Sequence, residues 1–365
     1  MTPTLDDRAV PRDNASPPSQ WQFGVPGVLD IPLRPQPEAP AAASISRWGE
    51  LHVDSVAMTT SGTWSAAILS RLAGHKRPTK LRAQPESSVL TLEQLRGLLR
   101  PDFENAVRGR CLAVQVDSWT VLCRVLGRYK LMVDSRDLGL APHLMLDGYW
   151  EMWCTELMLR QIRPGMVAVD VGANLGYFSV LMADLVGAGG RVVAVEPNPY
   201  LATLTERNLA LNGFQHTARV ERIAAAAAAQ DLAFRYRTSN PKNGHVVEAA
   251  GAPPHDGDTA QITVRGRRLD DVIGGPVDFI KIDVEGAEEQ TWAGLTRTLD
   301  ASPDIIVLME FNPARCRTPE AALAEFAARF PLRELTLDHG VQPVAPADVM
   351  SRDEDTLLVL TRLPL

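Results

Sequence analysis

From residue 167 onward, glycines and acidic side chains stand at the ends of apolar runs, where a ligand could bind. The apolar run at residues 167–172 ends in Gly172. Gly176 follows four positions later, with Asn174 midway between the two glycines. Glycines at this spacing let the backbone turn tightly and approach a bound molecule closely. Glu196 ends the next apolar run, 20 residues after Gly176, where a carboxylate can accept hydrogen bonds from ribose hydroxyls. Together these features predict a nucleoside site.

The spacing of the glycines limits which nucleoside this site could bind. A dinucleotide fingerprint GxGxxG would need glycine at 172, 174 and 177, but Asn174 and Tyr177 occupy the last two positions. No GxxxxGK[ST] phosphate loop is present either. A nucleoside without a phosphate cradle indicates S-adenosyl-L-methionine. Asp170 would then face its cationic amino end, and Asn198 would lie beside Glu196. The alternative is that Asp170 only caps the loop and Glu196 is a solvated strand end.

Asp283 and Glu285 are the candidate catalytic residues. They lie at the end of the apolar run at 277–284, two positions apart, so both side chains would point to the side where the strand opens. Two nearby carboxylates can differ in pKa, and one can act as a general base for a hydroxyl nucleophile. Either could instead hold the methionine part of the cofactor, which makes Asp283 a cofactor-binding candidate as well. Glu310, at the end of the following apolar run, could also face the site.

Strands alternating with helices would position these residues. We expect strands at 167–172, 191–195, 219–223, 277–284 and 304–311, with helices at 175–186, 198–212, 287–299 and 318–330. Such alternation predicts a parallel sheet covered on both faces, whose ligands bind at the carboxyl ends of the strands. Two late strands, 332–337 and 356–361, have no long helix between them and predict an antiparallel C-terminal edge.

The N-terminal part has a different character, and we divide the chain at 1–47, 48–140 and 141–365. Residues 1–47 hold nine of the 27 prolines, which predicts a disordered tail. In the accessory region at 48–140, a capping box at Thr91–Gln94 predicts the start of a helix. Pro101 should end this helix. Short strands are expected at 111–115, 120–126 and 128–134, with Gly127 as a turn.

Composition excludes several classes of protein. The 365 residues carry a net charge of −7, which argues against binding nucleic acid through its phosphates. The four cysteines form no CxxC pair, and their scatter suits reduced thiols, although Cys111 and Cys123 could pair in an oxidising compartment. We find no signal peptide and no transmembrane span, and therefore expect a cytoplasmic protein. The sequence does not determine its oligomeric state.

Four segments resemble the FkbM-type methyltransferases over about residues 120–361: HLMLDGYWE (143–151), DVGANLGYFSVLMA (170–183), AVEPNP (194–199) and DFIKIDVEGAE (278–288). The resemblance implies the Rossmann-like α/β sheet of class I methyltransferases, S-adenosyl-L-methionine as cofactor, and O-methylation of sugar or polyketide hydroxyls. Glu151 is a further cofactor-binding candidate, because a core position does not explain its charge. The chain departs from the family at Ala224–Ala229, so backbone near Ala224 or the Asp231 side chain would meet the adenine.

The sequence therefore predicts an S-adenosyl-L-methionine-dependent methyltransferase that acts on a hydroxyl of a sugar, glycan or related small molecule. Two alternatives stay open: a nicotinamide-dependent oxidoreductase, and a non-catalytic cofactor-binding module. Asp283, Glu310 and Asn312 offer oxygen ligands for Mg²⁺, but we rank a metal site below a metal-free one. His245 lies in an insertion that could cover the acceptor, where a solvated role ranks before a catalytic one.

Overall fold

A computed structural model describes residues 89–247 and 256–365 of the chain, which belong to one compact unit. The tail expected at 1–47, and the first part of the expected accessory region, lie outside the described residues. In the described ranges, no helix is long and apolar enough to cross a membrane. All four cysteines fall in these ranges and are free thiols.

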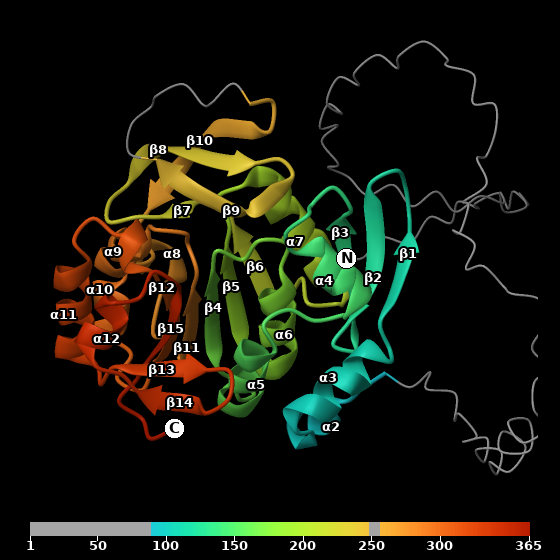
Figure 1. The fold of residues 1–365 in the computed structure, drawn as a ribbon, viewed down its shortest axis with the longest axis horizontal. Helices are drawn as coiled ribbons and strands as arrows, with labels where there is room; N and C mark the ends of the chain where they lie inside the picture. Colours follow the sequence, from blue (N-terminus) through green and yellow to red (C-terminus); the bar gives the residue numbers. More distant parts are fainter. Residues whose placement is uncertain (1–88, 248–255) are drawn as a thin grey trace, which may run out of the picture. The chain divides into compact units, whose positions relative to one another are not determined.

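Eight strands form the central sheet (Figure 1): β4 (Val167–Val171), β5 (Arg191–Val195), β6 (Ala218–Glu221), β11 (Phe279–Ile282), β12 (Ile306–Phe311), β13 (Arg333–Thr336), β14 (Gly340–Pro343) and β15 (Thr356–Leu360). Their order is β14-β13-β15-β12-β11-β4-β5-β6. The strands from β6 to β12 are parallel, whereas β15 runs antiparallel to both β12 and β13. This confirms the predicted α/β fold with a mostly parallel sheet and antiparallel strands at its C-terminal end.

The strand order has two consequences for the site. Within this sheet, the first strand in sequence is β4. The following strands β5 and β6 lie successively to one side of β4, and β11 lies on its other side. The carboxyl ends of β4 and β11 therefore flank a topological switch point, where ligands bind in open α/β sheets. At the other end, the edge strand is β14, which pairs with β13 in a hairpin that the sequence analysis did not predict.

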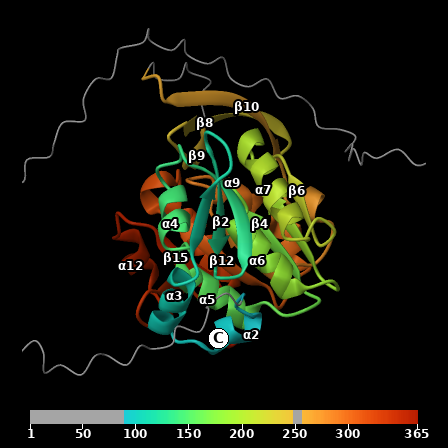
Figure 2. The ribbon, with the colours of Figure 1, turned by 90° about the vertical axis from the view of Figure 1, so that its right-hand side faces the viewer.

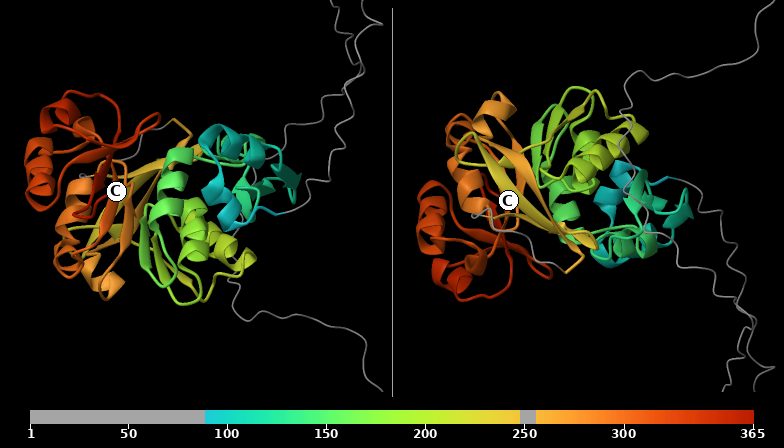
Figure 3. Two further views of the ribbon diagram at one scale, coloured as in Figure 1. Left: turned by 90° about the horizontal axis from the view of Figure 1, so that it is seen from below. Right: turned by 90° about the horizontal axis from the view of Figure 1, so that it is seen from above.

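Helices cover both faces of this sheet, because alternate residues of the parallel strands point to opposite sides (Figure 3). In β4, Ala168 packs in the cluster of one face, and Val169 and Val171 pack in the cluster of the other. The first face carries α5 (Met152–Gln161), α6 (Tyr177–Val186) and α7 (Pro199–Leu211). The second carries α8 (Asp270–Ile273), α9 (Glu288–Ala293), α10 (Thr296–Asp300), α11 (Pro319–Arg329) and α12 (Pro346–Met350). The single helix expected at 287–299 is thus two short helices.

The described part of the accessory region packs in the same apolar cluster as α6 (Figure 2). It contains α2 (Leu92–Gly97), α3 (Arg100–Arg108), β1 (Leu112–Gln115), β2 (Thr120–Val125) and β3 (Tyr129–Asp134), followed by α4 (Ala141–Leu146). The three strands form an antiparallel sheet, and Thr91 and Gln94 make the expected capping box. Pro101 does not end a helix: α2 stops at Gly97, and Pro101 lies in the first turn of α3, where its missing N–H needs no partner.

A second, mixed sheet contains the alanine run and the insertion with His245. Its strands are β7 (Ala224–Ala225), β8 (Gln230–Arg237), β9 (Asn240–Val247) and β10 (Thr259–Arg267), in the order β7-β10-β8-β9. The alanine run is therefore a short strand and a turn. The backbone of β7 pairs in parallel with β10, and this pairing joins the second sheet to the segment that follows β6.

Candidate functional site

The glycine turn after β4 forms one wall of the site. Gly172 has a φ of +84°, and a Cβ built on it would lie 1.8 Å from the carbonyl oxygen of Asp283. Only glycine fits here, because any side chain would collide with backbone. The amides of Gly172 and Ala173 donate to the Val195 carbonyl at 2.9 and 3.0 Å. The turn thereby joins the ends of β4, β5 and β11.

Glu196 follows β5 and is buried, with 4% of its surface exposed. Its carboxylate accepts the amides of Asn174 and Asn198, both at 2.8 Å. Burial raises the pKa of Glu196 to about 8. Because each carboxyl oxygen has more than one acceptor position, Glu196 keeps the capacity to bind ligand hydroxyls.

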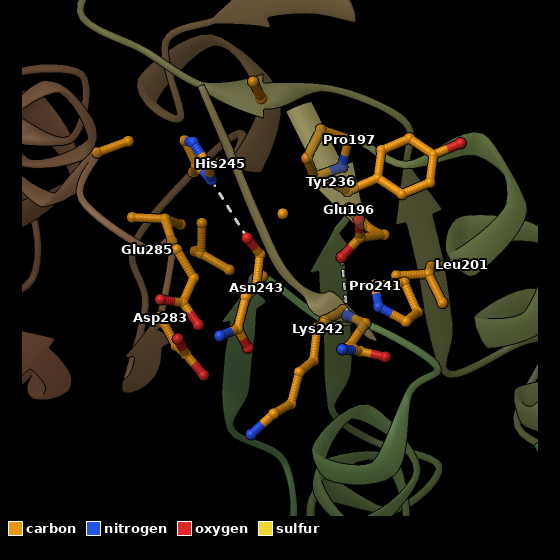
Figure 4. Close-up of a pocket in the computed structure, with 18 of the residues that line it drawn as sticks. Glu196, Pro197, Leu201, Tyr236, Pro241, Lys242, Asn243, His245, Asp283 and Glu285 are labelled. Carbon is orange, nitrogen blue, oxygen red and sulfur yellow. Dashed lines mark hydrogen bonds between the residues drawn. The ribbon is translucent and has the colours of Figure 1, made fainter. Parts of the chain in front are cut away.

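A cavity of about 680 Å³ unites these features (Figure 4). Such a volume suits a small molecule, since ligand pockets commonly measure roughly 300–1,000 Å³. The cavity is lined by residues of the strand ends on one side and of β8 and β9 on the other. Six of the nine predicted site residues line it: Glu151, Gly172, Asn174, Glu196, Asp283 and Glu285.

The other three predicted site residues lie behind this lining and support it. Asp170 is buried and accepts the hydroxyl of Ser179 on α6 at 2.6 Å. Gly176 begins α6 with a φ of +90°. Asn198 caps α7 by accepting the Tyr200 amide at 3.0 Å. The structure thus gives these residues local roles under the cavity wall.

Three carboxylates gather at the β11 and β12 end of the cavity. Oxygens of Asp283, Glu285 and Glu310 lie within 4.8 Å of one another. Burial, reinforced by the charge of Asp283, raises the pKa of Glu285 to about 7 and that of Glu310 to about 8. Near neutral pH this cluster can therefore exchange protons, which is the property a general base needs.

Lys281 on β11 is a site residue to which the sequence analysis assigned no role. It is 3% exposed, and its ammonium donates to Asp283 at 2.8 Å. Burial alone would lower the pKa of Lys281, but the carboxylates of Asp283, Asp170 and Glu151 outweigh it and raise that pKa. A lysine inside an apolar strand was the available signal, because such a charge requires a buried partner.

Arg315 is the second cation that the sequence analysis missed. It ends the 3-10 helix η1 (Pro313–Arg315), contacts Glu285 and Asp355, and lies 3.6 Å from Glu310. Asn312, included in the sequence-based Mg²⁺ alternative, instead caps η1 and donates to Asp355 at 3.0 Å. Since Lys281 and Arg315 already neutralise part of the acidic cluster, the metal-free site stays our prediction.

The segment before α5 supplies another wall. Glu151 has a φ of +39°, and one of its carboxyl oxygens is shielded from solvent without a hydrogen-bond partner in the described residues. Burial raises the pKa of Glu151. Trp150 also lines the cavity. Asp147 and Tyr149 are not part of this wall; they bind Arg108 at 2.8 and 2.6 Å.

The hairpin of β8 and β9 closes the opposite side of the cavity (Figure 4). His245 lies on β9 rather than in a loop, and its Nδ1 is 3.2 Å from the Asn243 carbonyl oxygen. Ala224, which we predict to lie near the adenine, lines the cavity. Asp231, the other residue proposed to meet the base, is exposed on β8 and is not among the lining residues.

A comparison with protein families matches residues 170–328 to the methyltransferase FkbM domain. Over this range the chain is similar to the FkbM methyltransferase domain. The matched range contains the glycine turn, Glu196 and the acidic cluster, which are the features that meet at the cavity.

The curated proteins that match this chain are named as methyltransferases. The chain is 34% identical over 104 residues to a protein-L-isoaspartate O-methyltransferase of Triticum aestivum, which covers 28% of this chain and 38% of the relative. It is 31% identical over 130 residues to the protein-L-isoaspartate O-methyltransferase of Methanothrix thermoacetophila. That match covers 32% of this chain and 58% of the relative. It is 27% identical over 184 residues to methyltransferase sdnD of Sordaria araneosa. That match covers 43% of this chain and 71% of the relative. The chain thus spans less than two thirds of the first two relatives.

Solved structures similar to the chain include a methyltransferase FkbM from Methylobacillus flagellatus KT. The identity is 18%, the match covers 53% of this chain and 43% of that one, and the TM-score is 0.35. An O-methyltransferase from Bacillus cereus in complex with SAH is 15% identical over 61% of this chain and 86% of that chain, with a TM-score of 0.34.

Proposed function

We propose that this protein is an S-adenosyl-L-methionine-dependent O-methyltransferase that acts on a hydroxyl of a sugar, glycan or related metabolite. The observation that carries the proposal is that Gly172 and Glu196, at the ends of adjacent parallel strands, line one cavity together with the carboxylates of Asp283 and Glu285. The FkbM domain supports the reaction type.

The cofactor fits the donors that the cavity presents. Glu196 would accept hydrogen bonds from the ribose hydroxyls, and Ala224 and Leu201 would flank the base. The shielded carboxyl oxygen of Glu151 and the carboxylate of Asp283 suit the cationic amino end. When bound, the cofactor supplies a methyl group activated by its sulfonium.

The acidic cluster favours a neutral hydroxyl as the acceptor. A hydroxyl is a weak nucleophile, so a base that takes its proton during the displacement accelerates transfer. Asp283 or Glu285 would hold that proton, and Arg315 fixes the Glu285 carboxylate. A carboxylate acceptor, which the name isoaspartate O-methyltransferase describes for the relatives, would need no such base and would be repelled by these charges.

Two measurements test this function. Calorimetry should show saturable binding of S-adenosyl-L-methionine, and incubation with cofactor labelled in the methyl group should transfer the label to a carbohydrate acceptor. Mass spectrometry of cell-surface and secreted glycans, with and without the protein, should reveal the acceptor as a species that loses one methyl mass. Wild-type protein that binds no S-adenosyl-L-methionine would refute the proposal.

The same experiments separate the alternatives. Binding of NADH, followed by fluorescence, would favour an oxidoreductase, which the broken GxGxxG pattern argues against. A protein that binds S-adenosyl-L-methionine, but whose removal from cells leaves the methylation of their glycans unchanged, would favour a non-catalytic module.

A further inference from the structure

Lys242 on β9 is a cation of the cavity wall that the proposed chemistry has not used. Two other lining cations face carboxylates: Lys281 binds Asp283, and Arg237 binds Asp258 at 2.9 Å. In the part of the chain that the structure describes, no carboxylate oxygen lies within 4.0 Å of the Lys242 ammonium. A lysine left this way beside a cavity has charge available for a bound anion.

The protein nevertheless holds Lys242 in a defined position. Its stem packs on the backbone of Gly139, where a Cβ would come within 2.9 Å of the lysine Cε. Its ammonium lies 4.7 Å from the ring centroid of Trp150, a cation–π contact. The turn of the hairpin is fastened by the Leu138 amide, which donates to the Ser239 carbonyl at 2.8 Å. Binding an anion there would cost little side-chain entropy.

This position lies next to the acidic residues of the site (Figure 4). Trp150, under the ammonium, immediately precedes Glu151. The charge of Lys242 lowers the pKa values of Glu151 and Glu285 in the site, and that of Asp137 beside it, in each case against the larger effect of burial. Lys242 therefore faces the end of the cavity where the amino-acid part of the cofactor would bind.

The amino-acid end of S-adenosyl-L-methionine carries two opposite charges. Its ammonium suits the carboxylates of Glu151 and Asp283, whereas its carboxylate would be repelled by them unless a cation lies beside it. Lys281 is engaged by Asp283 and Arg315 by Glu285, so these two cations are already committed.

We propose that Lys242 binds the α-carboxylate of the cofactor, which makes the β8–β9 hairpin part of the cofactor site as well as a wall facing the acceptor. This inference rests on the proposed function. It assigns to the hairpin a direct ion pair with the amino-acid end of S-adenosyl-L-methionine.

A chemical double-mutant cycle tests the ion pair. Dissociation constants of S-adenosyl-L-methionine and of decarboxylated S-adenosylmethionine are measured by calorimetry for the wild type and for Lys242→Met. Wild type should bind the decarboxylated compound about 10- to 100-fold more weakly, the range expected for a hydrogen bond to a charged group. Lys242→Met should bind S-adenosyl-L-methionine more weakly by a similar factor and should no longer distinguish the two compounds.

Control variants distinguish the loss of the ion pair from a general effect of charge and from misfolding of the hairpin. Lys130→Met removes an exposed lysine of β3 that does not line the cavity and should leave both constants unchanged. Lys242→Arg keeps the charge and should retain most of the discrimination. Equal thermal unfolding of Lys242→Met and wild type would show that the hairpin still folds.

The outcomes separate this proposal from the proposed function. If the wild type binds S-adenosyl-L-methionine and Lys242→Met keeps the full discrimination between the two compounds, the ion pair is wrong and the function stands. In that case Lys242 would be left for an anionic acceptor. If the wild type binds neither compound, both proposals fall together.

Discussion

Replacing Gly172 with alanine perturbs the closest backbone approach in the site. The added Cβ would lie 1.8 Å from the Asp283 carbonyl oxygen, so β4 and the segment after β11 must move apart. Overpacking of this kind costs typically about 1–3 kcal/mol. The positive φ of +84° adds strain of about 1–2 kcal/mol. We therefore expect Gly172→Ala to lose about 2–5 kcal/mol of unfolding free energy.

Gly213→Ala is the matched control for this substitution. Gly213 has a φ of +82°, and a Cβ built on it would meet no heavy atom within 4 Å. It follows α7 and is exposed, away from the cavity lining. Its replacement should therefore cost only the backbone strain, about 1–2 kcal/mol. The difference between the two variants isolates the collision with Asp283.

Urea denaturation and calorimetry with S-adenosyl-L-methionine measure both consequences. Gly172→Ala should unfold at a lower urea concentration than Gly213→Ala and should bind the cofactor about tenfold more weakly or worse, since it displaces two walls of the cavity. Gly213→Ala should bind like the wild type. Equal stability and equal cofactor affinity of the two variants would show that the collision with Asp283 has no effect.

Three further predictions concern the acidic cluster. Arg315 lowers the pKa of Glu285, so Arg315→Met should raise that pKa above about 7 and move the acidic limb of the methyl-transfer pH profile to higher pH; an unmoved limb would exclude Glu285 as the base. Burial raises the pKa of Glu310 from 4.5 to about 8, so the folded state keeps a proton that the unfolded state releases. Stability should thus fall as pH rises between these values, and Glu310→Gln should flatten that slope in urea unfolding curves. Asp283→Asn should slow methyl transfer by about 10²–10⁴-fold with cofactor affinity kept if Asp283 is the base, whereas a weakened affinity would assign it to cofactor binding.

The cavity walls built from strand ends could be predicted from the sequence for a simple reason. Gly172, Glu196 and Asp283 each follow an apolar run, and parallel strands bring their carboxyl ends to one edge of the sheet. The order of strands and helices therefore placed these residues together without knowledge of any contact between side chains. Asp170 and Asn198 belong to the same segments, but the sequence does not show which residues of a turn line a cavity and which lie behind it.

Residues from remote segments were not predictable in this way. Arg315 contacts Glu285 and Asp355, which are 30 and 40 residues away in the chain, and nothing local to Arg315 indicates these partners. The wall formed by β8 had a usable signal, because Leu232, Phe234 and Tyr236 alternate with other residues as in a half-buried strand. The neighbouring alanine run obscured that pattern.

The identity of the cofactor is measured by calorimetric titration of the wild-type protein and Glu196→Ala with S-adenosyl-L-methionine, with a parallel titration of the wild type with NADH. We expect one saturable site for S-adenosyl-L-methionine in the wild type, a clearly weaker site in Glu196→Ala, and no binding of NADH. Absence of S-adenosyl-L-methionine binding by the wild type, or equal affinity of Glu196→Ala, would contradict this expectation.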